Sequence, residues 1–419
     1  MQTQLPATLL SSEQGREADA ILRRCVHCGF CNATCPTYQL KGDELDGPRG
    51  RIYLIKQLLE GGEAEAGVGT VRQHLDRCLT CRNCEITCPS GVEYGRLLDV
   101  GREQVERRGN RPVVDRVMRW GLRNVLPFPR RFAFVVAVAR VLRPLLPGFL
   151  RKNIPPRAAR MAPWPTMRHV RRVILLDGCV QSVAAPEINR ATARLLDGLG
   201  ISVLRLSDEV CCGAVHQHLA APEAAAAMMR RNIDAWWPHL GSDADADVDK
   251  NIEAIVSTAS ACGLQVKDYA HALRHDNEYA EKAATISGLV KDISEVVAAE
   301  PVLKRHWPSQ RVAFHSPCTL QHGQRLGGVV EGILREWGHQ LVPVKDGHLC
   351  CGSAGTYSIL QAELADALRT NKQDALQANA PGVIASANVG CLLHLRQGAG
   401  QILLVKHWVE VLADCLESE

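Results

Sequence analysis

The 419-residue sequence has no low-complexity tract and no charged N-terminal region followed by an apolar run, which is the pattern of a secretory signal. No stretch reaches the roughly 18 apolar residues that a membrane-spanning helix needs. The longest apolar run is interrupted by Arg140 and Arg143. The sequence therefore favours a cytoplasmic protein, in which thiols stay reduced. We expect its 17 cysteines to bind metal rather than to form disulfides.

Motifs for nucleotide binding are also missing. No Gly-x-Gly-x-x-Gly follows an expected strand, and there is no P-loop. A flavin needs a fold of its own, so we expect FAD only in a partner subunit and no catalytic residue in this chain. The 46% hydrophobic and 22% charged content is that of an ordinary globular protein, and the length predicts two or three domains.

Cysteine is concentrated in two runs of identical spacing. Residues 25–36 read CVHCGFCNATCP and residues 78–89 read CLTCRNCEITCP, so each run has the form C-x2-C-x2-C-x3-C-P. This is the known run of bacterial ferredoxins, whose fourth cysteine ligates the other cluster. We assign cluster I to Cys25, Cys28, Cys31 and Cys88, and cluster II to Cys35, Cys78, Cys81 and Cys84.

Each run has a simple expected geometry. Two-residue spacers let a short loop place three thiolates around one cube, and the fourth cysteine should begin a helix and point away. Pro36 and Pro89 suit the first turn of such a helix, because proline lacks the N–H that would be unpaired there. Zinc is the alternative, although zinc ribbons pair two distant C-x2-C knuckles. Two [4Fe–4S] clusters indicate an electron relay rather than a catalyst.

The segment between the two runs predicts a helix. Gly47, Pro48 and Gly50 mark its entry turn, and the apolar residues that follow recur at helical spacing. These residues are Ile52, Leu54, Ile55, Leu58 and Leu59. We therefore expect residues 1–105 to form a mainly helical, ferredoxin-like module that holds both clusters.

Residues 173–415 contain an internal duplication. Its first three cysteines are each repeated 139 residues later, and the fourth is repeated 129 residues later. The difference matches the acidic segment 241–250, which only the first half has. We expect residues 171–300 and 301–419 to be two copies of one domain. The paired cysteines are Cys179, Cys211, Cys212 and Cys262 in the first copy, and Cys318, Cys350, Cys351 and Cys391 in the second.

Each copy has the rhythm of an α/β domain. In the first copy, apolar runs predict strands that carry Cys179 and Cys262 at their carboxyl ends, and a strand over 201–206 leads to the Cys-Cys-Gly motif. Ligands of parallel sheets lie beyond the carboxyl ends of the strands. The four cysteines of a copy should therefore converge. Gly213 and Gly352 permit a left-handed backbone beside them.

The two copies resemble the cysteine-rich CCG domains of heterodisulfide reductases and related oxidoreductase subunits. Members with a fifth cysteine, in a terminal C-x2-C, hold a noncubane [4Fe–4S] cluster, whereas this chain has Gln265 and His394 at that position. The resemblance implies a metal site in each copy, with His394 as a substitute ligand in the second. Zinc, an empty site and buried reduced thiols remain alternatives. His315, three residues before Cys318, either faces a substrate or has a surface role.

A basic segment, residues 106–170, joins the modules. Between Arg102 and Arg172 there are 18 Arg and Lys residues but only three acids, so this stretch carries a charge of about +15. The whole chain has a net charge of +4, so the remaining residues sum to about −11. Proline divides it into short helices. It is either a connector packed between the modules or a docking face for a partner subunit or an anionic membrane surface. We expect no nucleic acid to bind, because no recognition motif accompanies the charge.

Over nearly its whole length the chain resembles the iron–sulfur subunits of bacterial glycolate oxidases. The resemblance depends on residues 25–61, on the second cysteine run and on both Cys-Cys-Gly motifs. It implies that an FAD-bearing subunit oxidises glycolate to glyoxylate, that a second flavoprotein-like subunit joins it, and that this chain passes electrons toward a quinone. It also implies a cytoplasmic location, peripheral on the inner face of the membrane.

Proteins with other functions contain the same cysteine runs and Cys-Cys-Gly motifs. The iron–sulfur subunits of lactate, glycerol-3-phosphate and heterodisulfide reductase systems are the nearest alternatives. A catalytic thiol reductase would need the fifth cysteine that is absent here, and a zinc-stabilised scaffold would be colourless. The iron–sulfur interpretation predicts a brown protein.

Overall fold

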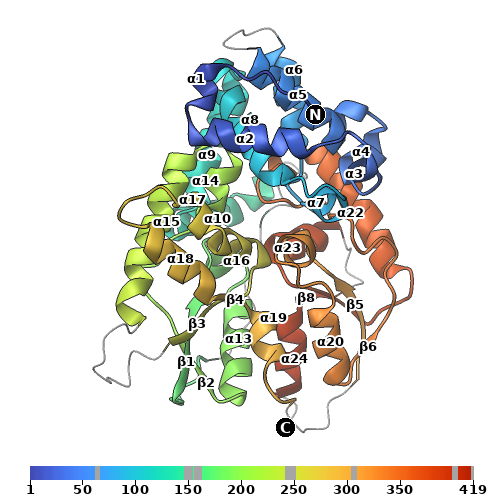
Figure 1. Cartoon of the computed structure of the whole chain (residues 1–419). Helices are drawn as coiled ribbons and strands as arrows, with labels where there is room; N and C mark the ends of the chain where they lie inside the picture. The colour runs from blue at the N-terminus through green and yellow to red at the C-terminus, as the bar shows by residue number, and fades with distance from the viewer. Residues whose placement is uncertain are drawn as a thin grey trace.

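The computed structural model describes residues 1–61, 67–145, 154, 163–240, 252–302, 309–398 and 404–416. Figure 1 shows a helical module at the N-terminus (blue, top) above two α/β domains that lie side by side. This arrangement agrees with the predicted fold class, a helical ferredoxin-like module followed by two repeated α/β domains. No helix in the described part of the chain is both long and apolar enough to cross a membrane.

The ferredoxin-like module is helical throughout its described residues. The predicted helix between the cysteine runs is α5, which buries Ile55 and Leu59 completely. α8 crosses it closely at Gly101, where an added Cβ would lie 2.8 Å from Ile55 Cγ1. The elements are α1 (Ala7–Leu10), α2 (Glu13–Arg24), α3 (Phe30–Ala33), α4 (Pro36–Lys41), η1 (Glu44–Asp46), α5 (Pro48–Glu60), α6 (Val68–Asp76), α7 (Asn83–Thr87) and α8 (Tyr94–Arg108).

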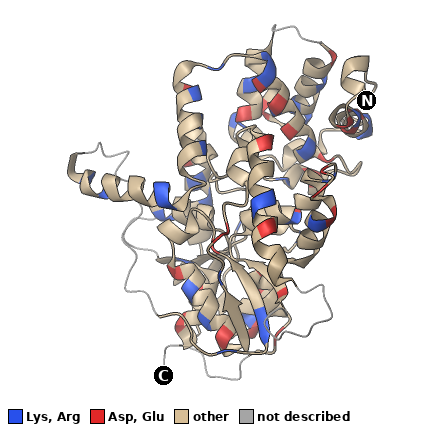
Figure 2. Cartoon of the chain, turned by 90° about the vertical axis from the view of Figure 1, so that its left-hand side faces the viewer, with Lys and Arg blue, Asp and Glu red and all other residues tan. Residues whose placement is uncertain are grey.

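Two helices of the basic segment follow the module, α9 (Val113–Val125) and α10 (Pro129–Val141), and then the 3-10 turn η2 (Arg143–Leu145). α9 is held to α6 by ion pairs of Arg111 and Arg119 with Asp76, at 2.6 Å and 3.0 Å. α10 projects to the left in Figure 2 and leads into the grey trace.

The outer faces of these two helices are apolar and exposed. The exposed residues are Val113, Val114, Val117, Met118 and Trp120 on α9, and Phe134, Val135, Val138 and Val141 on α10. A contiguous exposed apolar surface commonly marks an interaction site.

The first repeat contains a parallel sheet of order β2-β1-β3-β4. In β1 the last four residues, 173–176, are all buried, which is typical of a parallel strand covered on both faces. The elements are β1 (Arg171–Leu176), α12 (Gln181–Ala184), α13 (Glu187–Gly198), β2 (Ile201–Leu204), α14 (Ala214–His218), α15 (Pro222–Trp236), η3 (Trp237–His239), β3 (Ile252–Ser257), α16 (Ser260–Lys267), α17 (Tyr269–Ala272), α18 (Ala280–Leu289), β4 (Val290–Asp292) and α19 (Ile293–Ala298).

The second repeat contains a sheet of the same design, of order β6-β5-β7-β8 and again parallel. Its strands match those of the first repeat in the predicted alignment, as the duplication requires. The elements are β5 (Arg311–His315), η5 (Thr319–Gly323), α20 (Val329–Glu336), β6 (Gln340–Leu341), α21 (Tyr357–Leu360), α22 (Ala362–Gln377), β7 (Val383–Ser386), α23 (Val389–Gly398), β8 (Leu404–His407) and α24 (Trp408–Leu416).

Two features differ from the sequence-based expectation. The predicted third strand does not reach Cys262, because β3 ends at Ser257 and Cys262 lies in the first turn of α16; Cys391 lies likewise in α23. The edge strands β4 and β8 were not predicted, since they are only three and four residues long and carry charged side chains.

The two repeats share one hydrophobic core. Val173 and Leu175 of β1 belong to the same buried cluster as Val312 and Phe314 of β5. Hydrogen bonds also cross the interface, including Ser260 N to Ala387 O at 3.2 Å. The two cysteine-bearing ends of the sheets are therefore fixed relative to each other.

Candidate metal centres

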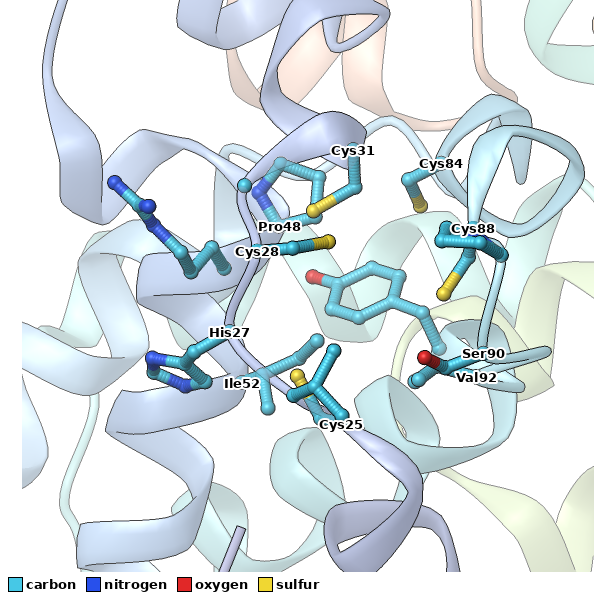
Figure 3. Close-up of a pocket in the computed structure, with 15 residues that line it drawn as sticks. Cys25, His27, Cys28, Cys31, Pro48, Ile52, Cys84, Cys88, Ser90 and Val92 are labelled. Carbon is cyan, nitrogen blue, oxygen red and sulfur yellow. The ribbon is translucent and has the colours of Figure 1, made fainter.

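The first cavity lies in the ferredoxin-like module between the loop 25–31 and the turn after α7. The space between its lining atoms, part of which is open to solvent, is about 430 Å³. In Figure 3 the sulfurs of Cys25, Cys28, Cys31 and Cys88 face this common space. Burial raises the pKa of Cys31 to about 11, with further contributions from the Cys25, Cys88 and Cys28 thiols. The structure thus brings together the four cysteines that the sequence assigned to cluster I.

The second cavity encloses about 370 Å³ and is lined by Cys35, Cys78, Cys81 and Cys84. Burial raises the pKa of Cys84 well above its usual range, and the Cys81, Cys78 and Cys35 thiols add to this effect. The cysteines assigned to cluster II therefore also lie together.

A shared wall separates the two cavities. Pro48, Cys84 and Tyr94 line both of them, and Tyr94 is almost fully buried, with 4% of its surface exposed. Centres held in the two cavities would be neighbours, because these side chains line both.

A buried arginine adjoins the second cavity. Arg51 is 1% exposed and lines that cavity. Its Nε donates to the carbonyl of His74 at 2.8 Å, its Nη2 donates to Thr37 Oγ1 at 3.1 Å, and its Nη1 lies 3.9 Å from Cys35 Sγ. Asp46, 3.6 Å away, supplies the balancing carboxylate.

The fourth cysteines of the two runs are placed differently. Cys35 is the N-cap of α4, with Pro36 at its first turn, as predicted. Cys88 is not at the start of a helix: it ends α7, and a turn at Pro89 and Ser90 separates it from α8. The expectation for Cys88 was therefore wrong, because the chain must reverse before α8 can pack on α5.

The donor sets fit iron–sulfur clusters. The first cavity is lined by its four assigned cysteines and by Cys84, the second by its four assigned cysteines, and no carboxylate lines either. His27 also lines the first cavity. Sulfur-rich donor sets of this kind are typical of [4Fe–4S] clusters and also of zinc.

The four cysteines of each repeat form a line of thiol contacts. In the first repeat, Cys179 Sγ lies 3.4 Å from Cys211 Sγ. Interaction with the Cys211 and Cys262 thiols, added to burial, raises the pKa of Cys212. In the second repeat the order is the same, with Cys318 next to Cys350, Cys350 next to Cys351, and Cys351 next to Cys391.

Glycine makes the bend between each cysteine pair and the next helix. Gly213 has φ +92° and Gly352 has φ +88°, the left-handed conformation that the sequence predicted for both. At Gly352 an added Cβ would lie 2.6 Å from the carbonyl oxygen of Ala365, and at Gly213 it would lie 3.2 Å from that of Ala225.

The second repeat adds polar side chains to its site. One ring nitrogen of His315 and the sulfurs of Cys351 and Cys391 all lie within 4.8 Å of one another. Asn388 Nδ2 donates to Cys391 Sγ at 3.5 Å. Burial lowers the pKa of Lys372, whereas the neighbouring Cys351 and Cys350 thiols act in the opposite direction.

The two histidines considered from the sequence are both buried. His315 is 2% exposed, so a surface role is wrong, and burial lowers its pKa to about 3. His394 is 4% exposed and its Nε2 lies 3.2 Å from the carbonyl oxygen of Ala365. That hydrogen bond uses one of the two ring nitrogens.

The second repeat packs against the second cavity of the ferredoxin-like module. Leu79, Cys318, Cys350 and Tyr357 belong to one buried cluster, with Cys81 packed against it. Among the neighbouring thiols that raise the pKa of Cys81, after burial, Cys318 is the foremost. The thiols of the two sites are therefore neighbours across the module boundary.

Two site residues were missed in the sequence. Arg51 lies three, four and seven residues before Leu54, Ile55 and Leu58, so it shares the apolar face of α5, and a charge on that face is a signal of a buried ion. Tyr94 gave no signal, because only the fold brings it between the cysteine runs.

Comparisons with known proteins agree with these sites. The family profile described as "4Fe-4S dicluster domain" matches residues 21–92, and the profile described as "Cysteine-rich domain" matches residues 173–267 and 312–396. A solved structure of a hypothetical protein from Helicobacter pylori superposes with a TM-score of 0.56 at 9% identity, covering 97% of this chain and 73% of that one. The latter likeness concerns the fold alone.

Curated relatives are more specific. The glycolate oxidase iron-sulfur subunit of Escherichia coli is 51% identical over 100% of both chains. The probable glycolate oxidase iron-sulfur subunit of Bacillus subtilis is 29% identical over 90% of this chain and 89% of its own. Lactate utilization protein A of Bacillus licheniformis is 24% identical over 58% of this chain and 98% of its own. The chain therefore belongs to the family of glycolate oxidase iron–sulfur subunits.

Proposed function

We propose that the chain carries electrons from an FAD-bearing subunit, which oxidises glycolate to glyoxylate, toward a quinone acceptor. The observation that supports this most is the continuity of sulfur sites: two cysteine-lined cavities share a wall, and the second adjoins the thiols of the second repeat. Iron–sulfur clusters supply one-electron transfer, whereas a 2-hydroxy acid gives up two electrons, so a flavin must divide the pair. No residue of this chain needs to touch glycolate.

The ligand sets of the proposal are those derived from the sequence. Cys25, Cys28, Cys31 and Cys88 hold cluster I, and Cys35, Cys78, Cys81 and Cys84 hold cluster II. The four cysteines of each repeat hold a further centre. The domain division at residues 105, 170 and 300 likewise stays a prediction.

The exposed apolar face of α9 and α10 is the proposed docking surface for the flavoprotein subunits. Its residues include Trp120, which is 63% exposed, and Phe134, which is 70% exposed. Aromatic side chains are the usual anchors of protein interfaces. We propose that the assembled complex lies at the inner face of the cytoplasmic membrane, where the quinone is available.

The test uses the assembled complex with Cys31→Ser, and with Cys415→Ser as the control, since Cys415 is a buried cysteine outside all four sites. We expect Cys31→Ser to abolish one ferredoxin-type paramagnetic signal and to stop glycolate-dependent reduction of a quinone analogue. Glycolate should still bleach the flavin of the partner subunit, because that step precedes this chain.

Two results would contradict the proposal. One is full quinone reduction with Cys31→Ser. The other is glycolate oxidation by the isolated chain without a flavoprotein subunit.

A further inference from the structure

The two cysteine sites differ at the residue that ends the strand before the first cysteine. His315 ends β5, and the position 139 residues earlier, at the end of β1, is Leu176. Both side chains are buried, at 2% and 3% exposed. The duplication therefore places an imidazole in one site where the other has an aliphatic side chain.

The environment of His315 leaves one nitrogen available. Nδ1 is 3.0 Å from Ser386 Oγ on the adjacent strand β7, which fixes the ring. Nε2 is buried and has no hydrogen-bond partner among the described residues. A buried polar atom without a partner destabilises the folded state, and a ligand at this nitrogen would remove that cost.

The neighbouring groups indicate what the ligand is. A His315 nitrogen lies within 4.8 Å of the sulfurs of Cys351 and Cys391, and two further thiols, Cys350 and Cys318, continue the line of contacts. Thiols and an imidazole are soft or borderline donors, which bind iron–sulfur clusters or zinc rather than Mg²⁺ or Ca²⁺. The site also adjoins Cys81 of the ferredoxin-like module, where a redox-inert zinc ion would carry no electrons onward.

We propose that the second repeat holds an iron–sulfur centre for which His315 is a ligand, in place of the missing fifth cysteine. His394, which occupies that cysteine's sequence position, does not belong to the group of His315, Cys351 and Cys391 whose donor atoms lie within 4.8 Å of one another. Ser386 is a positioning residue, because it orients the imidazole through Nδ1 in the way that outer partners orient metal-bound histidines. This inference rests on the proposed electron-transfer function and specifies one of its centres.

A nitrogen ligand has a measurable consequence. Where histidine replaces cysteine at a cluster, the reduction potential rises. The second-repeat centre should therefore have a higher midpoint potential than an all-cysteine variant of the same site, and its unpaired electron should couple to a histidine nitrogen.

The experiment uses the full chain, expressed with ¹⁵N-labelled histidine and purified anaerobically, as wild type, His315→Leu, His315→Cys and His394→Gln. His315→Leu copies the first repeat at this position, so it should fold. We expect pulsed paramagnetic resonance to show histidine-nitrogen coupling in wild type and His394→Gln but not in His315→Leu. His315→Cys should keep its iron and sulfide and lower the midpoint potential of that centre alone.

The outcomes separate this inference from the wider function. Coupling that survives in His315→Leu, or that disappears only in His394→Gln, would overturn the histidine assignment. Zinc in place of iron at the site, found by metal analysis of wild type against His315→Leu, would overturn the assignment of the centre. The two ferredoxin-type signals should be unaffected in every variant; their absence from wild type would overturn the proposed function instead.

Discussion

The two cysteine-rich repeats have the same backbone and the same line of four thiols, yet they surround those thiols differently. Three equivalent positions carry Leu176, Ile233 and Ala259 in the first repeat and His315, Lys372 and Asn388 in the second. All six side chains are buried. At these three positions the first site is therefore apolar, although His216 lies near Cys211, and the second site has a neutral imidazole, an amide and a lysine amine near its sulfurs.

The repeats also differ in what they adjoin. The second repeat contacts the second cavity of the ferredoxin-like module through Cys318 and Cys350, and Asn83 of α7 donates to its His348 carbonyl at 3.3 Å. The first repeat meets the module through Gln217 of α14, which donates to Asp99 at 3.0 Å, and through Asp268, which lies 4.0 Å from Arg82 of the second cysteine run. Duplication gave two similar sites, and among the described residues it is the cysteines of the second repeat that pack against the second cavity.

The largest expected effect comes from a matched pair of cysteine variants. Cys350→Ser should remove iron from the second repeat, alter the paramagnetic signal of cluster II and reduce turnover of the assembled complex at least tenfold. Cys211→Ser, at the equivalent position, should remove first-repeat iron and leave both ferredoxin-type signals unchanged. If Cys211→Ser rather than Cys350→Ser disturbed cluster II, the difference in contacts would not be the cause.

A smaller effect is expected from the two glycines. Alanine at either position must adopt a left-handed conformation, which costs about 1–2 kcal/mol. Gly352→Ala also brings a Cβ to 2.6 Å from a backbone carbonyl, compared with 3.2 Å for Gly213→Ala. We expect Gly352→Ala to lower the thermal unfolding midpoint more than Gly213→Ala and to lose more bound iron. Equal losses in the two variants would show that α22, which contains Ala365, can shift to make room for the added Cβ.

The smallest effect concerns the residues that end the edge strands. Asp292 ends β4 and His407 ends β8, at corresponding places in the two sheets. Burial raises the pKa of Asp292 from 3.8 to about 6, and burial lowers the pKa of His407 from 6.5 to about 4. Burial thereby keeps His407 uncharged above about pH 4, and it keeps Asp292 protonated up to about pH 6.

Their contributions to stability have opposite pH dependence. The folded protein keeps a proton on Asp292 that the unfolded chain releases, so this contribution falls as pH rises from about 4 to about 6. The unfolded chain protonates His407 more readily, so that contribution rises between about pH 4 and 6.5. Glu295 and Lys267 face Asp292, and Arg396 and Glu410 face His407.

Removing one group should reveal the other. Asp292→Asn should make the free energy of unfolding rise more steeply between pH 5 and 6.5 than in wild type, and His407→Gln should make it rise less. Each difference should be on the order of 1 kcal/mol, and the thermal midpoint should follow the same trend. Thermal unfolding of the anaerobic protein at several pH values measures both slopes. Two variants with the wild-type slope would show that neither side chain titrates differently on folding.

Much of this organisation could be predicted from the sequence because spacing dictates it. The two cysteine runs and the 139-residue offset are local patterns, and the apolar run of β1 identifies a covered parallel strand. The edge strands β4 and β8 could not be predicted, because they are short and their pairing depends on neighbours distant in the chain. The place of His315 depends on β5 and β7 lying side by side, which no local pattern encodes.

Arg51 has a consequence for the direction of electron flow. It is a permanent positive charge, 1% exposed, with one guanidinium nitrogen 3.9 Å from a sulfur of the second cavity. An added electron makes a cluster more negative, and a nearby cation in a low-dielectric interior favours that state. Of the two ferredoxin-type centres, the one beside this guanidinium should be the easier to reduce, so an electron arriving at its neighbour has a downhill step toward the second repeat.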